Sequence, residues 1–118
     1  RHYLIRDGLR ESLKALDLNL LVTKDSYASP TVTSFIPHDK DELTYIKSTL
    51  KSRFNITIAG GQGKLKGTIL RIGHMGKVSP FDILSVVSAL EIILTDYRKV
   101  NYIGKATLKF TEVIQHDA

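Results

Sequence analysis

The sequence predicts an α+β fold of two layers, in which a small, mostly antiparallel sheet carries its helices on one face. Stretches with helical spacing alternate with short β-branched stretches, in the order helix, strand, strand, helix, strand, strand, helix. A length of 118 residues with 42% hydrophobic content is enough to bury one core and too small to promise two. We therefore expect one domain over residues 1–118.

The first helix is expected over residues 3–17. One face is apolar at helical spacing and should pack on the rest of the chain. It consists of Ile5, Leu9, Leu13 and Leu16. Charged residues should cover the other face, namely Arg6, Asp7, Arg10, Glu11 and Lys14.

Two strands are expected next, over residues 20–22 and 31–36, with a loop over residues 23–29 between them. Pro30 and Pro37 bracket the second strand and stop its pairing at either end. A second helix then begins at Asp39, which together with Glu42 resembles a capping box. Its apolar face consists of Leu43, Ile46, Leu50 and Phe54. Lys51 and Arg53 lie in its last turn, where cations offset the negative end of the helix dipole.

The centre of the chain is residues 56–76, ITIAGGQGKLKGTILRIGHMG, where two short β-branched runs flank a glycine-rich loop. A period of two along the second run places Leu70 and Ile72 on one face, and Ile69 with Arg71 on the other. A guanidinium among aliphatic neighbours is costly unless a carboxylate or phosphate pairs with it. Arg71 is therefore a candidate anion-binding residue. The alternatives are an ion pair with an acid of the same chain, or simple exposure.

A third helix should begin at Ser79, the N-cap, which is followed by Pro80 and Asp82. Residues 83–94 are almost all apolar, so this helix should be largely buried or lie at an interface. The tail from Gly104 fits a helix and a strand equally well. Its apolar residues do not decide between the two.

The composition narrows the classes of function. The net charge is +5, but lysine and arginine are spread along the chain. Only Lys64, Lys66, Arg71 and Lys77 gather in one region, without the aromatic residues of a nucleic-acid stacking platform. No apolar run approaches the roughly 20 residues that span a bilayer. We therefore expect neither nucleic acid nor a membrane as partner, and the absence of cysteine fits a reducing cytoplasm.

Motifs for several other chemistries fail. Gly63-Lys64 is followed by Leu65, where a P-loop needs Ser or Thr, and a strand rather than a helix follows the glycines of a would-be dinucleotide fingerprint. The histidines have no metal-ligand spacing: His2, His38, His74 and His116. His74 is either an ordinary loop histidine or a neighbour of an anion bound at Arg71. The acids at positions 39, 41 and 42 are interpreted as a helix start rather than as a general acid and base.

The central residues also resemble a known family. Residues 58–63 (IAGGQG), 66–67 (KG) and 71–76 (RIGHMG) are similar to the C-terminal small domain of class V pyridoxal-phosphate-dependent aminotransferases, of the alanine–glyoxylate and serine–pyruvate type. Residues 82–84 and 89–91 resemble the family's next helix, so the similarity covers roughly residues 1–97. The resemblance implies the small domain of a fold-type I enzyme that uses pyridoxal 5'-phosphate.

The resemblance also implies a role for Arg71, which would bind the α-carboxylate of an amino-acid or 2-oxo-acid substrate. The glycines would let the backbone come close to the substrate and to a large domain. The Schiff-base lysine and the other cofactor-binding groups would belong to that large domain, which this sequence lacks. On this interpretation the chain is an inactive fragment without catalytic, cofactor-binding or metal-binding residues of its own.

The parent enzyme would transfer an amino group from a small amino acid such as alanine or serine to a 2-oxo acid such as glyoxylate or pyruvate, as a cytoplasmic homodimer. Related cysteine desulfurases need a thiolate from this domain, and the chain has no cysteine, although decarboxylating and lyase members of the wider fold stay open. Two alternatives come from other classes. One is a non-enzymatic basic domain that binds an acidic partner or RNA, and the other is a regulatory domain that senses an amino acid.

Overall fold

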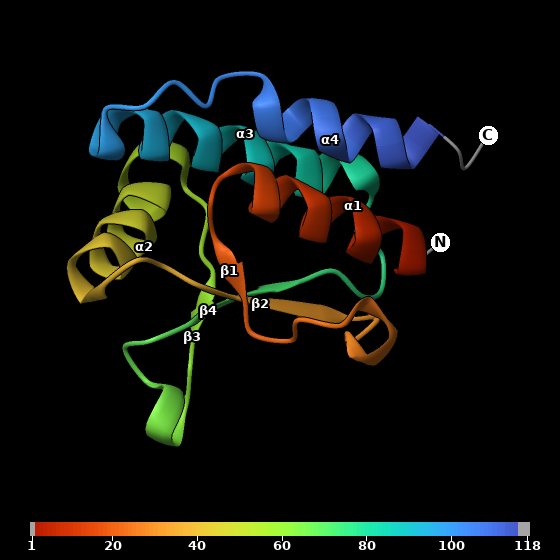
Figure 1. Cartoon of the computed structure of the whole chain (residues 1–118), viewed down its shortest axis with the longest axis horizontal. Coiled ribbons are helices and arrows are strands. Elements are labelled where there is room, and N and C mark those ends of the chain that lie inside the picture. The colour runs from red at the N-terminus through yellow and green to blue at the C-terminus, as the bar shows by residue number, and fades with distance from the viewer. Residues whose placement is uncertain (1, 116–118) are drawn as a thin grey trace.

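In the computed structural model, which describes residues 2–115, helices cover one face of an antiparallel sheet (Figure 1). The elements are α1 (His2–Ala15), β1 (Asn19–Leu20), the 3-10 helix η1 (Asp25–Tyr27), β2 (Val32–Ile36), α2 (Lys40–Phe54), β3 (Ala59–Gly60), the 3-10 helix η2 (Gly63–Leu65), β4 (Leu70–Gly73), α3 (Pro80–Arg98) and α4 (Lys105–Ile114). The strand order is β1-β2-β4-β3, and each neighbouring pair is antiparallel. The predicted fold class is confirmed.

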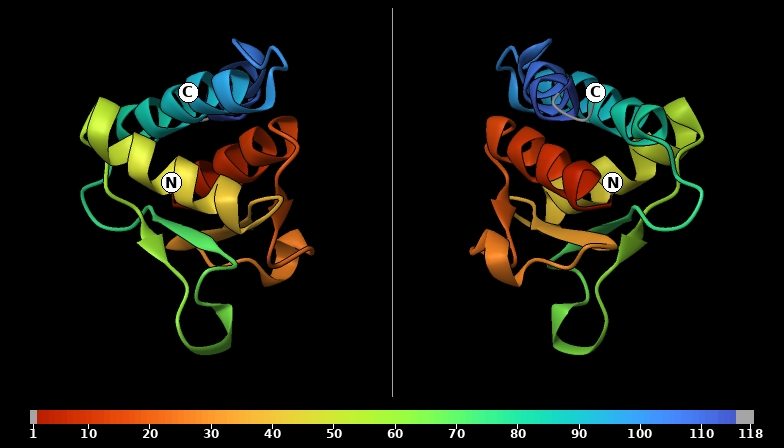
Figure 2. Two further views of the ribbon diagram at one scale, coloured as in Figure 1. Left: turned by 90° about the vertical axis from the view of Figure 1, so that its left-hand side faces the viewer. Right: turned by 90° about the vertical axis from the view of Figure 1, so that its right-hand side faces the viewer.

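The sheet turns one face to the helices and leaves the other uncovered. Leu70 and Ile72 of β4 lie opposite Phe35 and Thr33 of β2, and all four side chains are buried. Because side chains alternate along a strand, Arg71 points to the opposite face. The side views show the helices on one side of the sheet and the loop that carries η2 extending away from them (Figure 2).

The first helix forms, but it ends at Ala15, two residues before the predicted end. Its apolar face is buried as expected, but Arg10 does not lie on the exposed face. Its guanidinium is buried, pairs with Asp25 at 2.9 Å and donates to the carbonyl oxygen of Val22 at 2.8 Å. The hydrogen bond from Arg10 also lowers the pKa of Asp25. Arg10 therefore anchors the segment before β2, which the sequence predicted as a plain loop, onto α1.

The helix starts predicted from capping residues are confirmed. Asp39 accepts a hydrogen bond from the backbone N–H of Glu42 at 2.8 Å, but the Glu42 carboxylate accepts from the backbone N–H of His38 rather than that of Asp39, so this start is not a reciprocal capping box. Ser79 with Asp82 does form one. The strands are shorter than expected, since β1 and β3 have 2 residues each. None of the described helices has the length and apolar composition that crossing a membrane requires.

The tail that the sequence left open forms helix α4, and a distant carboxylate explains this. Glu91 of α3 is buried and accepts the backbone N–H groups of Gly104, Ala106 and Thr107 at 3.1, 2.8 and 2.7 Å. Gly104, the N-cap, has no side chain that could do this, so the carboxylate satisfies the free donors and offsets the positive end of the helix dipole.

Arg98 joins the ends of three helices. Its guanidinium donates to Glu42 at 2.6 and 2.9 Å, to the carbonyl oxygen of Leu16 and to the hydroxyl of Tyr102 at 3.1 Å. Tyr102 in turn donates to Asp17 at 3.1 Å. Burial alone would raise the pKa of Glu42, but hydrogen bonds from Arg98 and from the His38 amide outweigh it and hold the pKa below its ordinary 4.5.

The first prediction concerns Glu91. Glu91→Ala leaves the backbone donors at the start of α4 without their acceptor, so we expect it to lower the free energy of unfolding by about 2–3 kcal/mol. Denaturant unfolding measures the loss, and hydrogen exchange should show α4 losing protection first. Glu112→Ala, at an exposed position of the same helix, is the control and should stay within about 0.5 kcal/mol. Equal losses of unfolding free energy in the two variants would contradict the role of Glu91 at the start of α4.

The second prediction concerns pH. Because the pKa of Glu42 is lowered in the folded state, its contribution to stability is present above the ordinary carboxyl pKa of 4.5 and is lost as the pH falls through the lower folded value. Glu42→Gln should therefore be less stable than the parent at neutral pH, and the difference in melting temperature should shrink as the pH falls below 4.5. Melting curves from neutral to acid pH measure this difference. A difference that stays constant as the pH falls would refute the linkage.

Candidate substrate-binding site

Arg71 lies in the middle of the uncovered sheet face. Its partners on the neighbouring strands are Ser34 of β2 and Ala59 of β3. Both side chains are small, so the guanidinium has room above the sheet. The prediction that Arg71 and Leu70 face opposite sides of the strand is confirmed by the burial of Leu70 in the core.

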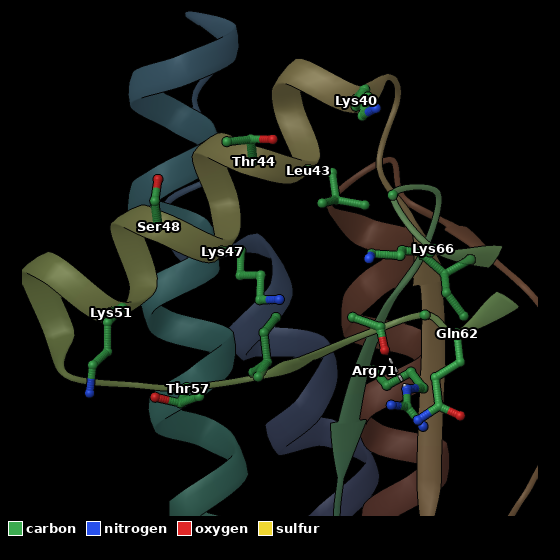
Figure 3. Close-up of a pocket in the computed structure, with 15 residues that line it drawn as sticks. Lys40, Leu43, Thr44, Lys47, Ser48, Lys51, Thr57, Gln62, Lys66 and Arg71 are labelled. Carbon is green, nitrogen blue, oxygen red and sulfur yellow. Dashed lines mark hydrogen bonds between the residues drawn. The ribbon is translucent and has the colours of Figure 1, made fainter.

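The Arg71 side chain is held by backbone rather than by an acid. Its Nε donates to the carbonyl oxygen of Gly60 at 2.8 Å, the dashed line in Figure 3. Within residues 2–115 no carboxylate forms an ion pair with Arg71, so the internal pair that the sequence left open does not form there. The two terminal nitrogens of the guanidinium can then engage a carboxylate side by side.

Arg71 also lies in the wall of a groove of about 940 Å³ between α2 and the loop that links β3 to β4 (Figure 3). The loop bends back on itself at Gly61, where an added Cβ would lie 2.3 Å from the carbonyl oxygen of Leu65. Glycine at this position is therefore explained by close packing within the loop itself. Gly63 and Gly67 have positive φ, of 57° and 80°, which favours glycine there too.

The basic residues gather differently from the prediction. Lys66 and Arg71 line the groove as a pair, but their companions are lysines of α2 rather than Lys64 and Lys77. The α2 residues that line the groove lie on one helix face: Lys40, Leu43, Thr44, Lys47, Ser48 and Lys51. The helical spacing of the three α2 lysines was visible in the sequence. The fact that this face turns toward the loop is tertiary information.

His74 does not accompany Arg71. Its side chain is fully buried and its Nε2 lies 2.8 Å from the hydroxyl of Thr33, whose side chain points to the helix side of the sheet. The histidine therefore packs in the interior and does not face the anion position. His116 lies outside the described residues. Within the described part no three His, Cys, Asp or Glu side chains gather as a metal ion would require.

Comparisons with known proteins give relatives along nearly the whole chain, although no family model matches. The chain is 45% identical over 102 residues to the soluble hydrogenase small subunit of Synechococcus sp. (strain PCC 6716), which aligns with 86% of this chain and 26% of that protein. The pyridoxamine-pyruvate aminotransferase of Mesorhizobium loti matches 100% of this chain and 30% of its own, with a TM-score of 0.90 and 28% identity. The ureidoglycine-glyoxylate aminotransferase of Bacillus subtilis matches 98% and 30%, with a TM-score of 0.82 and 31% identity.

The chain corresponds to the small C-terminal domain of the class V aminotransferases. It spans 26–30% of the length of the three proteins just compared. Hydrogenase is part of the name of the Synechococcus relative and is not an activity assigned to this chain. This small domain has no cysteine.

The third prediction concerns the loop of the small domain. Gly61→Ala forces its Cβ against the backbone of Leu65, so the loop must shift, and we expect the free energy of unfolding to fall by about 1–3 kcal/mol. Gly73→Ala is the matched control, because an added Cβ there meets nothing within 4 Å. It should change stability by less than about 0.5 kcal/mol. Urea unfolding of both variants measures the difference, and a loss no larger in Gly61→Ala would show that the loop is not sterically fixed.

Proposed function

We propose that this small domain serves a pyridoxal-phosphate-dependent aminotransferase and that Arg71 binds the carboxylate of the amino-acid or 2-oxo-acid substrate. One observation carries the proposal: the guanidinium is fixed by Gly60 on an uncovered sheet face, with no acid of the described chain to neutralise it. An arginine that is already oriented loses less conformational freedom when it binds a planar carboxylate.

Arg71 would act by positioning the substrate. Two parallel N–H···O hydrogen bonds fix the direction of a carboxylate as well as its place, and this orients the amino or keto group attached to the next carbon. The small neighbours Ser34 and Ala59 leave the approach to the guanidinium open.

The residues of this chain do not fit the cofactor itself. A Schiff-base lysine needs a desolvated environment that makes its amine reactive, whereas every lysine in this chain is exposed. Pyridoxal phosphate supplies the electron sink for amino transfer. The groups that hold it would belong to a large domain of the parent protein, against which this small domain would pack.

The proposed substrates are small. The names of the two structural neighbours, pyridoxamine-pyruvate and ureidoglycine-glyoxylate aminotransferase, each contain a 2-oxo acid of two or three carbons. These names support glyoxylate or pyruvate as the acceptor. For the donor we propose a small amino acid such as alanine or serine, by analogy with the serine-glyoxylate aminotransferase of Arabidopsis thaliana and the alanine-glyoxylate aminotransferase of Nostoc sp.. The parent would be a cytoplasmic homodimer.

The fourth prediction tests Arg71 in the full-length protein. Arg71→Ala should lower kcat/KM for alanine and glyoxylate by about 10²-fold or more, because removing one partner of a desolvated charge pair costs roughly 2–5 kcal/mol. Steady-state kinetics measure the loss, and the absorbance of the bound cofactor should be unchanged. Arg53→Ala removes an exposed arginine paired with Asp96 and should leave kcat/KM unaffected. Undiminished turnover in Arg71→Ala would overturn the proposed role.

A further inference from the structure

The groove beside Arg71 carries an unbalanced positive charge. Five of its lining residues are cationic, and none is acidic or aromatic. The cations are Lys40, Lys47, Lys51, Lys66 and Arg71. We propose that this groove binds an acidic polypeptide segment in an extended conformation. The four lysines carry this proposal, and Arg71 keeps the substrate role proposed above, so the two proposals can be tested separately.

The shape of the charge distribution favours a chain over a compact anion. Lys40, Lys47 and Lys51 follow one face of α2, over eleven residue steps that rise about 16 Å in total. In an extended chain, side chains on the same side recur about every 6.6 Å. A segment with acids at alternate positions can therefore present several carboxylates along the row, whereas one phosphate would reach only part of it.

The wall facing α2 offers backbone. Strand β3 is the edge of the sheet and pairs with β4 on one side only. This wall of the groove consists of Thr57, Ile58, Gly60 and Gly61. Lys47 lies close to it, since its Nζ is 3.4 Å from the position that a Cβ would take at Gly60. A segment in the groove would thus contact residues 57–61 on one wall and the ammonium groups of α2 on the other.

The cations of the groove have no acidic partner in the described part of the chain. The ion pairs there use other residues, and Lys51 donates only to the side-chain oxygen of Asn55, at 3.3 Å. Exposed lysines each contribute little, so affinity should come from several pairs acting together and should weaken with salt. Single-stranded nucleic acid fits less well, because the lining contains no aromatic side chain on which bases could stack.

The fifth prediction is tested by nuclear magnetic resonance of the 118-residue chain, titrated with a ten-residue peptide of alternating Glu and Thr. We expect saturable shifts in the amides of residues 57–61 and of α2, and no such shifts with an alternating Lys and Thr peptide. Replacing three groove lysines, Lys40→Gln, Lys47→Gln and Lys66→Gln together, should weaken binding about tenfold. Arg71 stays intact in this variant, so the result is independent of the substrate role.

A matched control variant removes three lysines that lie outside the groove lining. Lys24→Gln, Lys99→Gln and Lys109→Gln together remove the same charge outside the groove lining and should leave the affinity within about twofold. Lys47→Gln alone is the second variant and should weaken binding by a smaller factor if the triple variant does not fold. The proposal is overturned by the absence of saturable shifts, by equal weakening in the two triple variants, or by tighter binding of a ten-nucleotide oligouridylate.

Discussion

Leu70 and Ile72 must both face the helices, and this constraint places Arg71 between them on the open side of the sheet. Side chains alternate along β4, so a slip of one residue would put a guanidinium into the core and two aliphatic side chains into solvent. Burying an unpaired guanidinium costs far more than the local hydrogen bonds could return. The core residues of β4 therefore fix the register, and the register fixes the position of the candidate site.

The position of α2, which forms the other wall of the groove, depends on a second constraint. Glu42 at the start of α2 and Arg98 at the end of α3 form a buried pair, and Arg98 also donates to the carbonyl oxygen of Leu16, the residue that follows α1. Removing one member of such a pair is strongly unfavourable, since it leaves a buried charge alone. The pair thus couples the helix layer into one unit and holds the lysine-bearing face of α2 toward the loop.

The elements with local signals could be predicted from sequence, and those with distant partners could not. Asp39 and Ser79 predict where their helices begin because a cap acts within three residues. The alternation around Arg71 can be recognised from the five residues 68–72. The tail was ambiguous because Glu91, which satisfies the start of α4, lies 13 residues before Gly104. Arg10 was misplaced for the same reason, since its partner Asp25 is 15 residues away.

The use of arginine at position 71 follows from the number of its donors. One nitrogen, Nε, is already committed to the carbonyl oxygen of Gly60, which prevents the side chain from swinging over the sheet. The fork still has two terminal nitrogens in the same plane, and these match the two oxygens of a carboxylate. A lysine has three N–H donors, but they share one nitrogen at the end of a flexible stem, so it cannot present two parallel donors to a carboxylate from a side chain that the backbone holds in place. A fixed and still bidentate cation at this position therefore requires arginine.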